Sequence, residues 1–177
     1  MTKAREALKK VQRIVVKVGT STITYPNCSR NFSRIDKLAR ELADLHNQGK
    51  EIILVTSGAV AVGVERLGLK TKPKTIPGKQ AAAAVGQGIL MNTYEKFFGE
   101  YGQIVAQVLL TRTEVLDRHH YANSRNTFMT LLEQKVIPIV NENDVVALDD
   151  LKIGGNDNMS ALVAGIADAD LIIILSD

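Results

Sequence analysis

An apolar run passes directly into a loop of acids and amides in the sequence Lys135-Val-Ile-Pro-Ile-Val-Asn-Glu-Asn-Asp144. Residues 136–140 are apolar throughout, which indicates a strand that is buried on both faces. The polar character continues to Ser160, through Asp149, Asp150 and the triplet Asn156-Asp-Asn158. Connections between a strand and a helix usually have about 2–6 residues. A longer polar loop directly after a strand is typical of ligand binding, and the alternative is a solvated loop of caps and turns.

The rest of the chain repeats this alternation of apolar strand and helix. Apolar runs predict strands at residues 14–18, 51–56, 104–110 and 171–175, and apolar residues at helical spacing predict helices between them. Short strands that are apolar throughout favour a parallel sheet covered on both sides. The sequence therefore predicts an α/β fold with an open, mostly parallel sheet and helices on both faces.

Three local features refine this prediction. Ser33 begins a capping pattern that indicates the start of the first long helix. Pro138 would be costly in a central strand, so it favours an edge strand or a local bulge. A helix predicted from residue 80 to about residue 98 contains Gly86 and Gly88, which weaken a helix unless another segment packs closely there.

Composition indicates a soluble, single-domain protein. The chain has 177 residues, of which 45% are hydrophobic and 23% are charged, and its net charge of +3 is too small to indicate a nucleic-acid partner. Its single cysteine, Cys28, excludes an internal disulfide and suits a reducing compartment. The charged start has no apolar signal core, and no apolar run approaches the length of a membrane span. We therefore expect a cytoplasmic protein with no membrane partner.

Parallel strands end at one edge of their sheet, where open α/β sheets bind their ligands. Lining up the predicted strand ends brings together Gly19-Thr20-Ser21, Ser57-Gly58-Ala59, Thr111-Arg112, the loop from Asn141, and Ser176-Asp177. The turn at Ser57 begins a helix, so its free backbone N–H groups and the helix dipole favour an anion. These strand ends are the candidate site.

Lys17 stands near the end of the first predicted strand. In an apolar run its ammonium group must reach water or an opposite charge. Together with the backbone N–H of Gly19, this charge can stabilise a phosphoryl group. The alternative is an ordinary charge on an edge strand.

Several familiar catalytic motifs are absent from the sequence. Gly58 and Gly63 have the spacing of a P-loop, but Val64 stands where its lysine belongs, and no dinucleotide-binding fingerprint is present. His119 and His120 have no cysteine or third histidine nearby, so no metal site is predicted. The remaining set comprises a lysine, two Gly/Ser turns and an acid-amide loop. It suits a substrate with both an anionic and a cationic group, such as an amino acid, beside a phosphate.

Seven short motifs resemble the glutamate 5-kinases of the amino acid kinase family. They are Val16-Lys-Val-Gly-Thr-Ser21, Val55-Thr-Ser-Gly-Ala59, Gly78-Lys-Gln-Ala81, Ala84-Val-Gly-Gln87, Gln107-Val-Leu-Leu-Thr-Arg112, Asn141-Glu-Asn-Asp144 and Gly154-Gly-Asn-Asp-Asn158. The resemblance runs from about Arg13 to the last residue. It implies ATP-dependent phosphorylation of the side-chain carboxylate of L-glutamate, the first step of proline synthesis. ATP would be accompanied by Mg²⁺, for which no protein ligand is predicted.

The resemblance also implies a role for each matching residue. Lys17 and Asp157 would be catalytic, with Lys17 on the phosphates of ATP and Asp157 holding the catalytic lysines in place. The glutamate contacts would come from Ser57, Gly58, Ala59, Asp144 and Asn156. The nucleotide contacts besides Lys17 would come from Gly19, Thr20, Ser176 and Asp177.

Family members differ from this sequence in two respects. Gly155 stands where they commonly have an aspartate, and they continue well beyond Asp177. By resemblance, the second catalytic lysine, most of the nucleotide site and any PUA domain lie in that continuation. We therefore expect residues 1–177 to be the N-terminal, glutamate-binding part of one kinase domain, inactive by itself. The resemblance further implies inhibition by L-proline and assembly into a homo-oligomer, a dimer or a tetramer.

Two alternatives to this function remain open. The chain could belong to another amino acid kinase, which acts on acetylglutamate, aspartate or a nucleotide monophosphate; the Asn141-Glu-Asn-Asp144 motif argues against it. It could instead be a non-catalytic module that binds glutamate or mediates oligomerisation. A panel of substrates would distinguish the first alternative from a glutamate 5-kinase. A comparison of glutamate with ATP as ligands would distinguish the second, since a non-catalytic module should bind glutamate alone.

Overall fold

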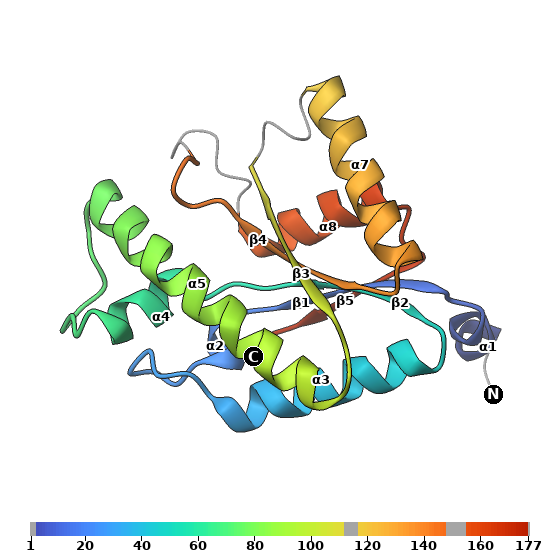
Figure 1. Ribbon diagram of the computed structural model, residues 1–177, viewed down its shortest axis with the longest axis horizontal. Coiled ribbons are helices and arrows are strands. Elements are labelled where there is room, and N and C mark those ends of the chain that lie inside the picture. Colours follow the sequence, from blue (N-terminus) through green and yellow to red (C-terminus); the bar gives the residue numbers. More distant parts are fainter. Residues whose placement is uncertain (1–2, 112–116, 148–154, 177) are drawn as a thin grey trace.

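The computed structural model describes residues 3–111, 117–147 and 155–176, which form a single sheet with helices on either side (Figure 1). The strands are β1 (Arg13–Val18), β2 (Glu51–Val55), β3 (Val105–Leu110), β4 (Ile137–Glu142) and β5 (Leu171–Leu175). The helices are α1 (Lys3–Lys9), α2 (Thr20–Ile23), α3 (Phe32–Asn47), α4 (Ala59–Arg66), α5 (Ile76–Glu100), α7 (Arg118–Glu133) and α8 (Asn156–Ala167).

The described sheet is parallel throughout, with the strand order β3-β4-β2-β1-β5. Helices α3 and α5 lie on one face of it, and α7 and α8 lie on the other (Figure 1). The predicted α/β class, with a parallel sheet between two helical layers, is confirmed. No helix in the described part of the chain is long and apolar enough to cross a bilayer.

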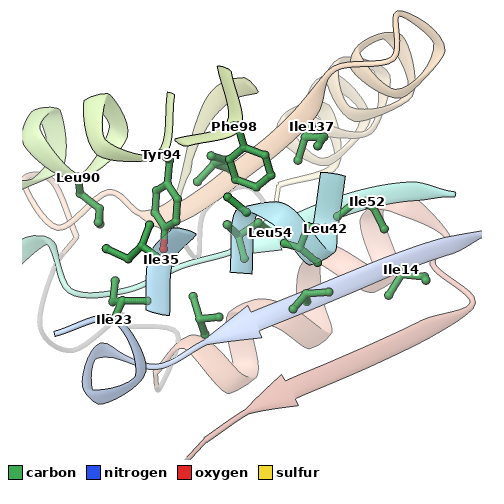
Figure 2. Packing of buried hydrophobic residues seen from close by; sticks show 14 of the residues in the cluster. Ile14, Ile23, Ile35, Leu42, Ile52, Leu54, Leu90, Tyr94, Phe98 and Ile137 are labelled. Atoms are coloured by element: carbon green, nitrogen blue, oxygen red, sulfur yellow. The ribbon is translucent and has the colours of Figure 1, made fainter. Parts of the chain in front are cut away.

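Each face of the sheet carries its own hydrophobic core. Under α3 and α5, the aromatic rings of Tyr94 and Phe98 reach the sheet beside the isoleucines and leucines of three strands (Figure 2). The opposite core joins Val15, Ile53 and Val140 to the apolar faces of α7 and α8. Because successive side chains of a strand point to opposite faces, both cores draw on the same apolar strands. This explains why the strand sequences are apolar without alternation.

Helix boundaries differ from the predicted ones at two places. The N-cap of α3 is Asn31, not Ser33: the Asn31 side chain is buried and accepts a hydrogen bond from the backbone N–H of Arg34 at 3.1 Å. Asn31 and Ser33 have similar capping ability, so the sequence alone does not decide between them.

Helix α5 begins at Ile76 with Thr75 as its N-cap, before the predicted residue 80. At α5 the Thr75 hydroxyl accepts from the Gly78 N–H, and Pro77 is tolerated in the first turn. The segment in front of it, which holds Lys70, Lys72 and Lys74, is called the basic loop.

Pro138 lies in an inner strand, so the expectation of an edge strand is wrong. β4 lies between β3 and β2, and Pro138 pairs with Ala106 of β3. The ladder between β4 and β2 begins only at Ile139, opposite Leu54. The backbone N–H of Ile137 points toward β3, because it donates to the carbonyl oxygen of Ile104. The backbone nitrogen of the next residue, Pro138, therefore points toward β2. The missing N–H of Pro138 therefore falls just before the β2 ladder begins, where no ladder bond is lost.

The closest helix contact joins α4 to α5 at two glycines. A Cβ atom on Gly63 would lie 1.8 Å from the carbonyl oxygen of Ala82, and one on Gly86 would lie 1.8 Å from that of Ala59. Backbone atoms therefore touch across the helix pair. This contact is the close packing expected at Gly86 of the predicted long helix, whereas a Cβ atom on Gly88 would have nothing within 4 Å.

We expect the stability of the fold to fall at acid pH, in part through Asp170. Its carboxylate accepts hydrogen bonds from the backbone N–H groups of Arg13 and Gln12, both at 2.8 Å, and these bonds hold the pKa of Asp170 below its usual range. A lowered pKa means that the unfolded chain binds more protons, so the contribution is present above the ordinary pKa of about 3.9 and is lost as the pH falls below it. Thermal unfolding between about pH 3 and pH 7 measures this slope. An undiminished slope in Asp170→Asn would contradict the assignment.

Candidate active site

The carboxyl ends of β1, β2 and β4 enclose a cleft of 240 Å³. Its lining residues are Thr20, Ser57, Gly58, Ala59, Val60, Ala61, Lys72, Asn141, Glu142, Asp144, Gly155 and Asn156. The loops after β2 and β4 lie together at the left of Figure 1, where α4 also begins. The structure thus brings together the five residues predicted to contact substrate, although they are up to 99 positions apart, from Ser57 to Asn156.

Lys17 lies within the sheet, and its charge is paired. Strand β1 runs between β2 and β5, so the alternative of an edge-strand charge is wrong. The residue is only 8% exposed, and its Nζ atom lies 2.7 Å from the Oδ1 atom of Asp157 at the start of α8. A buried ammonium group needs such a partner, and the Asp157 side chain is itself largely exposed. The pair therefore joins β1 to the start of α8.

Hydroxyl groups and a glycine surround this lysine. A Cβ atom on Gly19 would lie 3.7 Å from the Lys17 Nζ atom and 3.9 Å from the hydroxyl oxygens of Ser21 and Thr22. A ligand group could approach the ammonium closely here because position 19 has no side chain. The adjoining Thr20 hydroxyl lies 3.0 Å from that of Ser57, which links the lysine side of the site to the cleft.

The Gly19 backbone N–H makes a long hydrogen bond to β5, and its contact with a phosphate stays a prediction. It donates to the carbonyl oxygen of Leu175 at 3.4 Å, because β5 pairs with β1 in the register Val18 to Leu175. Ser176 follows directly and is exposed, and Asp177 lies outside the described residues. Arg112, Asp149 and Asp150 of the predicted strand ends also lie outside them.

A second set of hydrogen bonds fixes the floor of the cleft. The Asn156 Nδ2 atom donates to the carbonyl oxygen of Thr56 at 2.9 Å, and the Ser57 hydroxyl donates to that of Val18 at 3.4 Å. The end of β2 is therefore tied both to α8 and to β1. Asn156 and Ser57, which come from two of the predicted motifs, thus meet at the end of β2.

Helix α4 starts at the cleft and offers backbone donors. Its N-cap, Gly58, has φ +99°, a conformation that a side chain would strain. Within the described residues, no acceptor receives the backbone N–H of Gly58 or of Ala59. With the helix dipole behind them, these groups suit a carboxylate or a phosphate.

Several polar residues of the site were not predicted. Asn141 is 3% exposed and donates to Gln87 of α5 at 2.8 Å, and Gln87 donates in turn to Gln107 of β3 at 2.9 Å. Lys72 lines the cleft from the basic loop before α5, and Glu142 lines it from the end of β4. The sequence placed Asn141 and Glu142 in the polar loop without a role. Gln87 belongs to the motif Ala84-Val-Gly-Gln87, but its contact with Asn141 and the place of Lys72 in the cleft depend on how the helices dock.

A larger cavity of 540 Å³ adjoins the cleft and shares Thr20 and Lys72 with it. Its other lining residues are Ser21, Thr24, Tyr25, Pro26, Cys28 and Arg34. In the described residues, no group of three or more His, Cys, Asp or Glu side chains is arranged to hold a metal ion. His119 and His120 lie at the start of α7, where their backbone N–H groups donate to the Asp117 carboxylate at 2.9 Å.

Together, the parallel sheet, the small cleft at its carboxyl edge and the lysine–aspartate pair define an α/β protein with a candidate site for a small charged ligand. The chain belongs to the amino acid kinase family, whose model matches residues 12–177.

The chain is similar to curated proteins that are named glutamate 5-kinase. The relative from Moorella thermoacetica is 57% identical over 98% of this chain and 46% of its own length. Those from Clostridium tetani and Clostridium acetobutylicum are 55% and 53% identical, over 98% and 100% of this chain. The chain spans about half to two thirds of the length of these relatives, 46% to 66%.

Proposed function

We propose that this chain carries the glutamate-binding part of a glutamate 5-kinase, which transfers the terminal phosphoryl group of ATP to the side-chain carboxylate of L-glutamate. The observation that carries the proposal is the buried Lys17, paired with Asp157 at 2.7 Å beside a cleft lined by Ser57, Asp144 and Asn156. The relatives named glutamate 5-kinase support the same reaction.

The cleft offers a partner for each charge of glutamate. The backbone N–H groups of Gly58 and Ala59 suit the α-carboxylate, and the Asp144 carboxylate suits the α-ammonium group. The side-chain carboxylate would then extend toward Thr20 and Lys17. A volume of 240 Å³ lies below the usual range for ligand pockets, about 300–1,000 Å³, and so favours an amino acid over a nucleotide.

The reaction needs no general base. The side-chain carboxylate of glutamate has an ordinary pKa of about 4.3 and is already ionised at pH 7. Correspondingly, no histidine lines the cleft as far as the chain is described. A carboxylate oxygen forms the bond to the terminal phosphorus as the bond to the bridging oxygen of ADP breaks. Catalysis then depends on positioning and on neutralising the charge of the phosphoryl oxygens, which is the role proposed for Lys17.

The nucleotide would approach from the side of Lys17, Gly19 and Ser176. The hydroxyls around Lys17 suit phosphate oxygens, and Mg²⁺ binds substrate phosphates together with only one or two carboxylates. The described residues contain no carboxylate cluster for the metal. Most ligands of Mg²⁺ would therefore come from the phosphates of ATP and not from the protein. L-Proline has the same α-carboxylate and a cationic amine, so we propose that it competes for the cleft. We also propose that the protein is a homo-oligomer, which light scattering would test.

The proposal predicts that this chain binds L-glutamate and discriminates against N-acetyl-L-glutamate, which lacks the ammonium group. Asp144→Ala should weaken glutamate binding by about 2–5 kcal/mol, since it leaves that ammonium group unpaired in a partly desolvated site. Isothermal titration calorimetry with glutamate, N-acetylglutamate and proline measures this. Asp44→Ala, which removes an exposed carboxylate of α3, is the control.

Phosphoryl transfer is tested in a chimaera that joins this chain to the part of the Moorella thermoacetica relative that it does not match. In the chimaera, Asp144→Ala should raise the KM for glutamate and leave the KM for ATP nearly unchanged. Absence of glutamate binding by the unmodified chain would refute the glutamate site. Equal losses for glutamate and ATP would refute the role of Asp144.

A further inference from the structure

We propose that the hydroxyl of Tyr94, buried in the core behind the cleft, is a positioning group that sets the orientation of the Ser57–Gly58 peptide unit and thereby the affinity for substrate. The inference rests on the proposed glutamate site. It assigns to α5 a part in binding, although Tyr94 does not line the cleft.

Tyr94 reaches the end of β2 from α5 through the hydrophobic core. It is fully buried, and its ring extends from α5 with the hydroxyl oxygen at the end away from the helix (Figure 2). That oxygen lies 2.7 Å from the hydroxyl oxygen of Thr56, which is also fully buried. The neighbouring core positions Leu90 and Phe98 hold only apolar side chains, so a hydroxyl here serves no packing need.

The two hydroxyl protons have a defined order. Thr56 donates to the carbonyl oxygen of Ser57 at 3.3 Å and has only one proton to donate. Tyr94 must therefore donate to Thr56. Burial raises the pKa of Tyr94 well above its usual range, so the phenol keeps its proton. Donation by Tyr94 polarises the Thr56 hydroxyl and strengthens its long bond to Ser57.

The carbonyl of Ser57 and the N–H of Gly58 belong to one peptide unit. The described chain has no cis peptide bond, so this N–H points away from its carbonyl. Holding the carbonyl against the buried Thr56 hydroxyl keeps the Gly58 N–H directed away from the core. Gly58 lines the cleft and has φ +99°, and a glycine in that conformation can rotate its peptide at little cost. An external restraint is therefore needed to hold one orientation.

The same relay steadies a second binding residue. The carbonyl oxygen of Thr56 accepts the hydrogen bond from Asn156 at 2.9 Å. Tyr94 thus acts through Thr56 on both binding residues. The Thr56 side chain links it to Gly58, and the Thr56 carbonyl links it to Asn156. Its contribution should appear as substrate affinity rather than as fold stability alone.

The test compares Tyr94→Phe with the double variant Tyr94→Phe/Thr56→Val. The single variant loses one donor and leaves the Thr56 oxygen short of a partner, so a fall in Tm is expected. In the double variant both hydroxyls are replaced by apolar groups of similar shape, so its stability should approach that of the unmodified chain. By calorimetry, both variants should bind L-glutamate about tenfold more weakly, the effect of one lost hydrogen bond.

Two controls separate positioning from general damage. Tyr101→Phe removes a tyrosine hydroxyl at the C-cap of α5, which donates to Asp36 at 2.8 Å, and should leave glutamate binding unchanged. Thr56→Ser keeps the hydroxyl and should retain most of the affinity. A stable double variant that binds glutamate as tightly as the unmodified chain overturns the proposal.

A ligand-free measurement keeps this proposal distinct from the proposed function. In the NMR spectrum of the chain alone, the amide resonances of Gly58 and Ala59 should move in the double variant and stay in place in Tyr101→Phe. If the unmodified chain fails to bind glutamate, the proposed function is refuted. The amide resonances still test whether Tyr94 and Thr56 orient the Ser57–Gly58 peptide unit. Unmoved resonances in the double variant would overturn it.

Discussion

Gly86→Ala should unfold this protein or separate α4 from α5, the largest effect expected of a single added methyl group. The new Cβ atom would lie 1.8 Å from the Ala59 carbonyl oxygen and 2.5 Å from the Gly63 nitrogen, which are both backbone atoms. Neither can move aside as a side chain could, so the helices must part. Overpacking costs about 1–3 kcal/mol and more when backbone must shift. We therefore expect a loss of about 3 kcal/mol or more, and a fall in Tm of about 6–12 °C for a chain of this size.

The site should suffer together with the fold, since Ala59 is the first residue of α4 and lines the cleft. Moving it displaces the backbone N–H groups proposed to bind the α-carboxylate. Gly88→Ala is a matched control in the same helix: nothing lies within 4 Å of its new methyl group, and the position is exposed. It should raise stability by about 0.5–1 kcal/mol. Thermal unfolding and glutamate calorimetry of both variants test the contrast, and equal Tm values would contradict the described helix contact.

Lys17→Ala should lower the kcat of the chimaeric enzyme by more than about a hundredfold, with a much smaller change in the KM for glutamate. A charge that acts on the phosphoryl group mainly in the transition state affects kcat, and losing such a group costs at least about 3 kcal/mol. The substitution also leaves Asp157 without the cation 2.7 Å away. Its carboxylate is largely exposed, so water can solvate it and the fold should survive.

Steady-state kinetics on Lys17→Ala and on Lys96→Ala, an exposed lysine of α5, provides the measurement. Lys96→Ala should be indistinguishable from the unmodified enzyme. An unchanged kcat with a raised KM for glutamate would assign Lys17 to the substrate pocket and refute its role in transfer. Circular dichroism and Tm of both variants establish that each is folded.

The sequence by itself determined the class of the fold and the edge that carries the site. Residues 136–140, like the other short apolar runs, alternate with helical patterns along the chain, which favours parallel strands between helices. Once the strands are parallel, their carboxyl ends must share an edge, so Ser57, Asp144 and Asn156 could be placed together without coordinates. Lys17 could be singled out because an ammonium in an apolar strand requires a partner.

Tertiary structure alone decided the strand order and the partners. Pairing occurs between residues that are far apart in the sequence, so no local pattern shows that β1 is an inner strand or that Pro138 meets β2 before their ladder begins. The same holds for the hydrogen bond from the Gly19 N–H to Leu175 of β5, because the acceptor of a backbone N–H cannot be read from the sequence. Tyr94 and Gln87 have ordinary helical positions in the sequence. Only the docking of α5, whose Gly86 touches the backbone of α4, brings Tyr94 to Thr56 and Gln87 to Asn141.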